Sequence, residues 1–156
     1  MIVWRLTLKQ HTTPDGEGAR RYGGRWNKPG TPVVYTSGTL SLAALEYLVH
    51  VDSDLLPDAL VSVRATIPDS LKIETIDTTR LPVDWKDKII PVSLQQLGSD
   101  WAIHAKSPVL KVPSVVIEHE WNYVLNPLHP DFSKIHFEPA IPFEYDPRLI
   151  RERRGN

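Results

Sequence analysis

Three arginines, two adjacent glycines and two aromatic residues stand together in the stretch from Arg20 to Asn27, which reads RRYGGRWN. The stretch fits neither helical nor strand periodicity, so we expect a loop. Ordering such a loop costs conformational entropy, so we expect that its fixed shape serves a function. Because planar guanidinium groups bind phosphates in bidentate fashion, we expect this loop to hold an anionic nucleotide.

A carboxylate elsewhere in the chain has an unusual position. The spacing of Leu42, Leu45 and Val49 predicts a helix over residues 40–49, and Glu46 lies on or beside its apolar stripe. A carboxylate there costs free energy unless it is paired or lines a cavity. The alternative is a side chain at the edge of the stripe that reaches water.

A hydroxyl and a further arginine complete the set of candidates. Ser114 follows Pro113 in the apolar run 109–117, which predicts a strand with an edge or a bulge at the proline. Alternation over residues 2–8 predicts a first strand that displays Arg5 on its less apolar face. A surface arginine is the alternative for that position.

Arginines, a tyrosine, a glutamate and a hydroxyl would suit chemistry at the nicotinamide ribose of NAD. Arginine forks bind the pyrophosphate, and Tyr35 could stack on the nicotinamide ring. Breaking the N-glycosidic bond builds positive charge on the ribose, which a carboxylate such as Glu46 would stabilise. The residue types alone leave this as one of several possible chemistries.

Other chemistries lack their motifs. The chain has no cysteine, which excludes disulfides, a thiol nucleophile and cysteine zinc sites. Its six histidines form no HExxH pattern, so no metal site is expected. Neither a phosphate-binding P-loop nor a GxSxG nucleophile motif is present.

Composition predicts one soluble domain. Apolar residues make up 41% of the 156 residues, and the formal net charge of -1 gives no overall attraction for nucleic acid. The N-terminus resembles no signal peptide and no apolar run is long enough to span a membrane, so we expect a cytoplasmic protein. We expect a single domain over residues 1–150 and a solvated tail over 151–156.

The remaining elements predict a mixed α+β domain with mainly antiparallel strands. Residues 37–39 should form a turn that offers a hydroxyl cap to the following helix, residues 52–58 a connection, and residues 122–132 a turn-rich segment. Short helices are expected up to residue 97 and over 101–105. Further strands are expected over residues 32–36, 59–67, 71–76 and 135–143.

Several motifs resemble those of the RES domain family and fall in that family's order. They are GGRWN at 23–27, VYTS at 34–37, SLAALE at 41–46, VPS at 112–114 and NYVLNP at 122–127, with HP at 129–130 and DF at 131–132. The likeness extends from about Trp4 to beyond Phe143, nearly the whole chain. By this resemblance the sequence is identified as a member of that family.

The resemblance implies an α+β fold similar to ADP-ribosyltransferases, with small antiparallel sheets around an NAD cleft and flanking helices. It implies the toxin of a bacterial toxin–antitoxin system, which consumes NAD by hydrolysis or phosphorolysis of the nicotinamide–ribose bond without a metal. The implied partner is an Xre-like DNA-binding antitoxin that covers the active site, with a possible toxin homodimer in the complex. Direct contact with nucleic acid or membrane is not expected.

The resemblance also implies residue roles. Arg25, Glu46 and Ser114 match the arginine, glutamate and serine that give the family its name, and Tyr35 matches its active-site tyrosine. We expect these four residues to be catalytic, with Ser114 placing the ligand or Glu46 rather than acting as a nucleophile.

The NAD-binding set extends beyond the catalytic residues. Arg5 resembles the strand-one arginine that ADP-ribosyltransferase-like folds direct at the NAD phosphate or ribose. Arg25 and Tyr35 are expected to bind NAD as well, and Trp26 and Asn27 either touch NAD or hold the loop. The acceptor of the ribosyl group stays open between water, phosphate and a protein side chain. The alternatives are an ADP-ribosyltransferase that modifies a cellular protein and a non-catalytic nucleotide-binding module.

Overall fold

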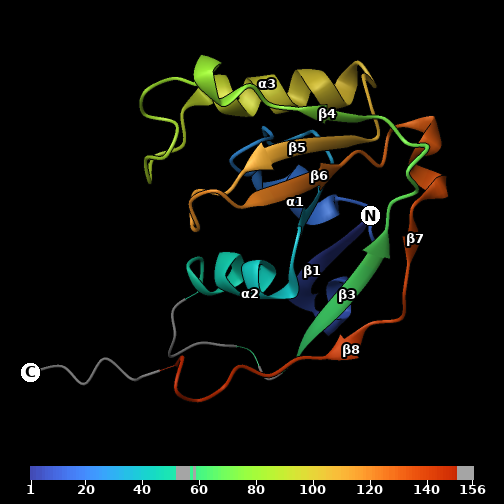
Figure 1. Cartoon of the computed structure of the whole chain (residues 1–156), viewed down its shortest axis with the longest axis vertical. Coiled ribbons are helices and arrows are strands. Elements are labelled where there is room, and N and C mark those ends of the chain that lie inside the picture. The colour runs from blue at the N-terminus through green and yellow to red at the C-terminus, as the bar shows by residue number, and fades with distance from the viewer. Residues whose placement is uncertain (52–56, 58, 151–156) are drawn as a thin grey trace, which may run out of the picture.

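The computed structural model describes residues 1–51, 57 and 59–150. Its strands form one curled sheet in the order β4-β5-β6-β2-β1-β3-β7, and β8 also pairs with β3 (Figure 1). Only the β4–β5 pair is parallel among the described strand pairs. The strands are β1 (Ile2–Leu8), β2 (Val34–Ser37), β3 (Leu60–Thr66), β4 (Ile73–Thr75), β5 (Val109–Pro113), β6 (Trp121–Leu125), β7 (His136–Phe137) and β8 (Ile141–Pro142).

Within the described residues, three α-helices flank this sheet: α1 (Glu17–Tyr22), α2 (Leu40–Leu48) and α3 (Val92–Ile103). The mixed α+β class predicted from the sequence is therefore confirmed. Residues 52–56 and 58 of the expected connection, and the expected tail over 151–156, lie outside the described residues. None of the helices in the described part of the chain is long and apolar enough to cross a membrane.

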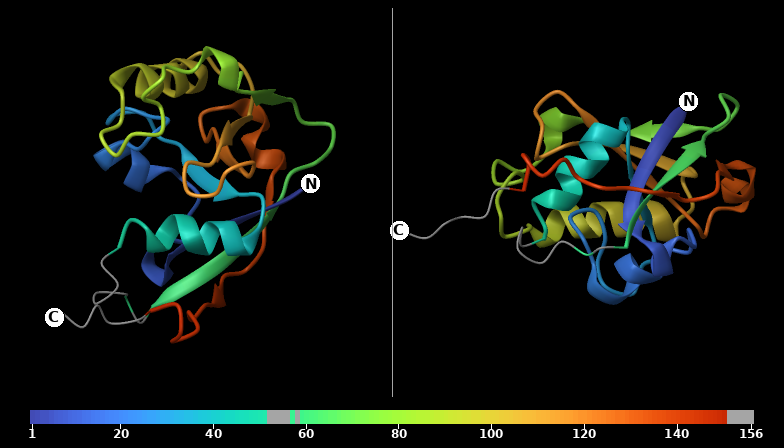
Figure 2. Two further views of the ribbon diagram at one scale, coloured as in Figure 1. Left: turned by 60° about the vertical axis from the view of Figure 1, so that its left-hand side comes forward. Right: turned by 90° about the horizontal axis from the view of Figure 1, so that it is seen from below.

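The sheet has two halves that meet at one narrow junction. β1 pairs with β3 along its whole length, from Ile2 opposite Thr66 to Leu8 opposite Leu60. By contrast, β1 pairs with β2 only where Trp4 lies opposite Ser37. Figures 1 and 2 show the two halves turned away from each other, with α2 beside the junction and α3 along the β4–β5 edge. The expected small antiparallel sheets are the two halves of this one sheet.

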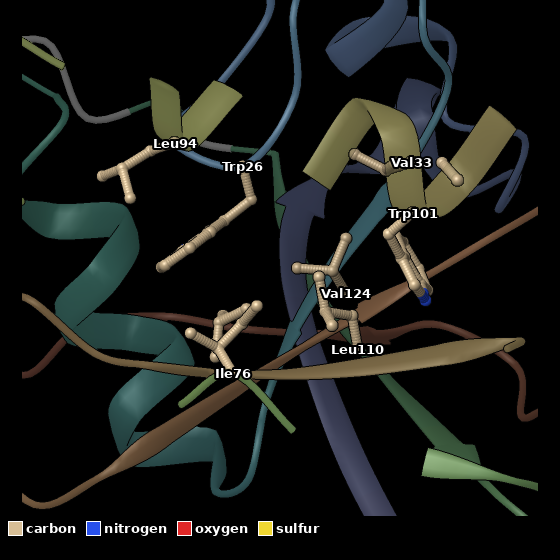
Figure 3. Close-up of a cluster of buried hydrophobic side chains, with 9 residues drawn as sticks. Trp26, Val33, Ile76, Leu94, Trp101, Leu110 and Val124 are labelled. Carbon is tan, nitrogen blue, oxygen red and sulfur yellow. The ribbon is translucent and has the colours of Figure 1, made fainter. Parts of the chain in front are cut away.

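A hydrophobic cluster fixes α3 against the sheet. Leu94 and Trp101 of α3 pack with Leu110 of β5 and Val124 of β6, and each of these side chains is at most 1% exposed. Trp26 inserts into the same cluster from the loop after α1 (Figure 3). The arginine-bearing loop is therefore anchored in the core by its own tryptophan.

The prediction of a loop over residues 20–27 is wrong for its first three residues, which end α1. Glu17 pairs with Arg20 at 2.6 Å and with Arg21 at 2.7 Å, and these arginines lower the pKa of Glu17 to about 2. Pairs spaced three and four residues apart stabilise a helix and were readable in the sequence. Arg20 and Arg21 thus bond within α1, whereas Arg25 bonds the segment at Trp85 and Asp87.

Three further expectations are corrected. One continuous helix replaces the two short helices that were expected around Gly98, because this glycine lies at a close contact with Trp26 and does not end the helix. β6 occupies residues 121–125, where the sequence was interpreted as turn-rich from residue 122. The aromatic and β-branched residues of this segment are a strand signal that was missed. The last predicted strand is reduced to β7 and β8, since prolines lack the N–H that a ladder requires.

A stability prediction concerns the C-terminal end of α3. Ala105 has a φ of 45° in the left-handed region, and the N–H of Lys106 donates to the Trp101 carbonyl at 3.3 Å across the turn. Glycine adopts this conformation without the Cβ penalty, so Ala105→Gly should raise the free energy of unfolding by up to about 1 kcal/mol. Denaturant unfolding measures the change. Ala105→Val should have the opposite effect, and equal stability of the two variants would contradict the prediction.

Candidate active site

Helix α2 presents Glu46 to the junction of the two half-sheets. The helix begins as predicted with a hydroxyl cap, because the Thr39 side chain accepts the N–H of Leu42 at 3.1 Å. Leu42 and Ala43 are buried and hold the helix against the sheet. Glu46 lies one turn further along and is half-buried, so its carboxylate lies at the edge of the packed face.

Two hydrogen bonds fix one oxygen of this carboxylate. The Ser114 hydroxyl donates to Glu46 Oε1 at 2.7 Å, and the Asn122 amide donates to the same atom at 2.5 Å. The Ser37 hydroxyl donates to Asn122 Oδ1 at 2.6 Å, which orients the amide. The residue after β5 and the second residue of β6 thus meet at one oxygen of the glutamate, and β2 holds the amide of that second residue in place.

The second oxygen of Glu46 is left available. Oε2 has no hydrogen-bond partner among the described residues. In that part of the structure every buried side-chain nitrogen or oxygen has a partner, so Oε2 cannot be one of the buried atoms. Oε2 is therefore accessible from outside the protein. A carboxylate with one oxygen fixed and one open can face a developing positive charge without having to reorganise.

Ser114 also organises the turn between β5 and β6. Its Oγ accepts the N–H groups of Val116 and Ile117 at 3.1 and 3.0 Å, and its own N–H donates to the Glu120 carbonyl at 2.9 Å. The strand expected to continue to residue 117 ends at Pro113, because the serine hydroxyl satisfies the next N–H groups in a turn. One side chain couples the shape of this turn to the orientation of Glu46.

Arg25 lies near Glu46 and holds a neighbouring segment. Its guanidinium donates to the carbonyls of Trp85 at 2.6 Å and Asp87 at 3.0 Å. Burial lowers the pKa of Arg25, and the negative charges of Glu46 and Asp87 oppose this change. Two of the five guanidinium N–H groups are used in these bonds within the described structure, so the others remain for an anion.

Tyr35 supports the Arg25 loop from β2. Its hydroxyl donates to Asn27 Oδ1 at 2.7 Å and accepts the N–H of Trp26 at 3.0 Å. A Cβ at Gly24 would come within 2.6 Å of the Tyr35 oxygen, so the loop needs glycine at this position. The tyrosine therefore determines how closely the loop approaches the sheet.

Trp26 and Asn27 are buried within the protein, at 3% and 0% exposure. The Asn27 amide donates to the carbonyls of Ala19 and Thr31 at 2.8 and 3.0 Å. These contacts use the polar groups of Asn27 inside the protein. Of the two expectations for this pair, the geometry favours holding the loop over touching a ligand.

Arg5 lies on β1 as predicted, and its guanidinium contacts the segment after β1. Its guanidinium donates to the Thr13 carbonyl at 3.4 Å, and burial lowers its pKa while Asp15 opposes the change. The structure therefore brings Arg25, Tyr35, Glu46 and Ser114 together and leaves Arg5 beside the segment after β1.

Sequence reasoning assigned no role to Asn122 or Ser37. Asn122 lies opposite Ser37 on β6 and β2, and this register places the amide next to Glu46. Both residues belong to motifs that resemble the family, yet nothing local distinguishes them from other polar strand residues. Only strand pairing reveals that Asn122 contacts the carboxylate and that Ser37 orients its amide.

Tyr35 predicts how stability depends on alkaline pH. Burial raises the pKa of Tyr35, so the folded protein holds the phenolic proton more tightly than the unfolded chain. The free energy of unfolding therefore keeps its full value below about pH 10, the pKa of tyrosine in the unfolded chain, and falls as the pH rises above that value. Thermal unfolding between pH 8 and pH 11 should therefore show a steeper loss in the wild type than in Tyr35→Phe. Parallel curves for the two proteins would contradict this prediction.

Ser114→Ala should lower activity without preventing folding. It removes a hydrogen bond to a charged group, worth about 1.5–3 kcal/mol, which corresponds to roughly 10- to 100-fold in turnover. Turnover of the substrate proposed below measures the effect. Ser133→Ala, which changes an exposed hydroxyl, is the matched control. Full activity of Ser114→Ala would show that the bond to Glu46 does not matter.

Metal chemistry gains no support from the geometry. Within residues 1–51, 57 and 59–150, no group of three or more histidine, aspartate or glutamate side chains is gathered as a metal site needs. The candidate site is instead a carboxylate with hydroxyl and amide donors and a nearby guanidinium. Such a set acts through charge and hydrogen bonding.

Comparisons with known proteins agree over nearly the whole chain. The family model described as RES domain matches residues 2–146. A protein named Toxin Res from Photorhabdus laumondii is 39% identical over 159 residues, covering 99% of this chain and 100% of the relative. A protein named Prs ADP-ribosylating toxin from a Sphingobium species is 35% identical over 155 residues, covering 96% of each.

A solved structure shares the fold. A chain from the crystal structure of the M. tuberculosis MbcT–MbcA toxin–antitoxin complex superposes with a TM-score of 0.67 at 20% identity. The match covers 96% of this chain and 86% of the other. The curled sheet with its flanking helices is thus a fold that this chain shares with a chain of that complex.

Proposed function

Because the chain belongs to the RES domain family, we propose that it is the toxin of a toxin–antitoxin pair and that it breaks the nicotinamide–ribose bond of NAD. The names of its relatives support the first part, since one is a Toxin Res and another an ADP-ribosylating toxin. ADP-ribosylation uses NAD as the donor of the ribosyl group. The second part depends on the geometry around Glu46.

The asymmetric fixation of Glu46 is the observation that carries this proposal. Ser114 and Asn122 hold Oε1, while Oε2 is accessible. When the bond from ribose C1 to nicotinamide breaks, its electron pair leaves with the nicotinamide, which departs neutral. Positive charge develops on the ribose, and the fixed carboxylate stabilises it.

Arg25 supplies the charge for the other end of the substrate. Its remaining N–H groups bind the pyrophosphate of NAD, while its bonds to Trp85 and Asp87 keep the guanidinium in place. In this proposal Trp26 and Asn27 position the arginine from the core. A contact of Tyr35 with nicotinamide, and of Arg5 with phosphate or ribose, remain predictions from the family resemblance.

Transfer of ADP-ribose to a cellular protein is the second candidate. The similarity to a Prs ADP-ribosylating toxin favours it. The first chemical event, loss of nicotinamide, is the same in both candidates. They differ only in whether water, phosphate or a protein side chain attacks the ribose.

Release of nicotinamide from NAD by the purified protein tests the proposal. We expect free nicotinamide to accumulate, with ADP-ribose or its phosphorylated form as the second product. With labelled NAD and cell lysate, a transferase would mark a discrete protein. Binding of NAD in calorimetry without any release over hours would refute catalysis and leave a nucleotide-binding module.

We further propose that an antitoxin covers the site in the resting complex. The similarity to a chain from a toxin–antitoxin complex, and to proteins named Toxin Res, supports a partner of this kind. The Xre-like character of that partner, a toxin homodimer and the cytoplasmic location remain predictions. Arrest of growth when the chain is expressed alone, and its relief by the antitoxin, would test this pairing.

A further inference from the structure

A pocket of about 210 Å³ lies beside Ser114. It is smaller than the roughly 300 Å³ that small-molecule sites usually offer, so it can hold a fragment but not a dinucleotide. Its lining includes Trp85, Lys86, Glu118, His119 and Trp121 in addition to Ser114. The two tryptophans offer flat apolar contacts and the ionisable side chains offer hydrogen bonds, so the pocket suits a small polar group.

Residues of the candidate site hold both sides of this pocket. Arg25 fixes the segment that carries Trp85 and Lys86 through the Trp85 carbonyl. Ser114 fixes the β5–β6 turn, which carries Glu118 and His119, through its hydroxyl. Both segments project on the same side of the molecule (Figures 1 and 2). Because Ser114 also bonds Glu46, the pocket adjoins the carboxylate.

His119 has an uncommon backbone conformation in this turn. Its φ is 68°, in the left-handed region that few residues other than glycine adopt. Hydrogen bonds of Ser114 and Glu120 across the turn, at 2.9 and 3.3 Å, maintain this conformation. An unfavourable backbone conformation that is held in place beside a site often serves a function.

We infer that this pocket receives the acceptor of the ribosyl group and that His119 is the base that takes the acceptor's proton. The inference rests on the proposed function. In this step the acceptor's O–H or N–H attacks ribose C1 while the bond from C1 to nicotinamide breaks. Its proton goes to an imidazole nitrogen of His119, and nicotinamide leaves with the electron pair.

The need for a base narrows the class of acceptor. Charges of both signs border the pocket: Glu118 and Glu120 are carboxylates of its lining, Lys86 lies 3.5 Å from Glu118, and Arg25 holds the Trp85 carbonyl. A phosphate dianion attacks through an oxygen that carries no proton, whereas water or a neutral side chain must lose a proton to a base. A base at this pocket therefore serves an uncharged acceptor, which is water or a neutral nucleophilic side chain.

The test compares nicotinamide release by the wild type and by His119→Asn at pH 7.5, with and without inorganic phosphate. Asparagine tolerates the left-handed backbone but cannot act as a base, and His119→Gly is the second variant because glycine also fits this conformation. His136→Asn, an exposed histidine on β7, is the matched control. Calorimetric NAD binding and thermal unfolding accompany each variant.

We expect phosphate to leave the wild-type rate unchanged. His119→Asn and His119→Gly should lose roughly 100-fold in rate, with NAD affinity unchanged. A wild-type-like rate in both variants, or acceleration by phosphate, would overturn the inference and leave the proposed function standing. Absence of release from the wild type would refute both.

Discussion

Glu46→Gln should reduce the rate of nicotinamide release by roughly 10²- to 10³-fold, the usual loss when one fixed electrostatic group is removed from a transition state. Glutamine keeps an oxygen that can accept the bonds from Ser114 and Asn122. The variant should therefore keep the fold while it replaces the accessible Oε2 by an uncharged amide. Because the charge acts on the ribosyl cation, kcat should fall much more than NAD affinity.

Three measurements on purified proteins check this expectation: initial rates of nicotinamide release, NAD binding by calorimetry and thermal unfolding. Glu144→Gln, which neutralises an exposed carboxylate in the C-terminal segment, is the matched control and should behave as the wild type. If Glu46→Gln released nicotinamide at the wild-type rate, Glu46 would not be the stabilising carboxylate. A loss of NAD affinity with unchanged kcat would assign Glu46 to ground-state binding instead.

Gly98→Ala should destabilise the protein and disturb the site together. A Cβ on this residue would lie 1.8 Å from the Trp26 carbonyl oxygen, so α3 and the loop that carries Arg25 would have to separate. Overpacking of this kind costs about 1–3 kcal/mol, which for a chain of this size lowers Tm by roughly 2–12 °C. Two further links between the same elements would be strained: Ser99 Oγ accepts the Lys28 N–H at 2.9 Å, and the Gln95 side chain donates to the Gly24 carbonyl at 3.0 Å.

Gly18→Ala provides the matched control for this substitution. Gly18 lies within α1, and a Cβ added there would meet no atom within 4 Å, so alanine should leave stability unchanged or raise it slightly. Because Arg25 directly precedes Trp26, Gly98→Ala should also weaken NAD binding, whereas Gly18→Ala should not. Wild-type values of Tm and NAD affinity for Gly98→Ala would show that α3 does not hold the loop.

Elements with strong local periodicity were predictable from the sequence. Alternation gave β1 at its observed bounds, Ile2–Leu8, and β3 within a residue or so. Apolar spacing and the Thr39 hydroxyl gave α2 and its beginning. In each case the signal lies within a few neighbouring residues, because the side chains that face the core recur with the period of the element itself.

Elements whose form depends on distant contacts were not predictable. Gly98 indicates the end of a helix by local rules, yet α3 continues through it. The glycine is needed there because the carbonyl of Trp26 occupies the space where a side chain would lie. β6 exists because it pairs with both β2 and β5, although its sequence begins a turn-rich segment. Such contacts join residues that are far apart in the chain, which no local pattern records.

For the candidate site, the amino-acid sequence established which residue types were present and, through the family resemblance, singled out Arg25, Tyr35, Glu46 and Ser114. Their arrangement depends on the folded chain. Folding fixes Glu46 Oε1 between Ser114 and Asn122, and it buries Trp26 and Asn27 away from solvent. A sequence motif specifies which side chains are present. Which oxygen of Glu46 stays free is decided only in the folded chain, where donors from two distant segments bond the other oxygen.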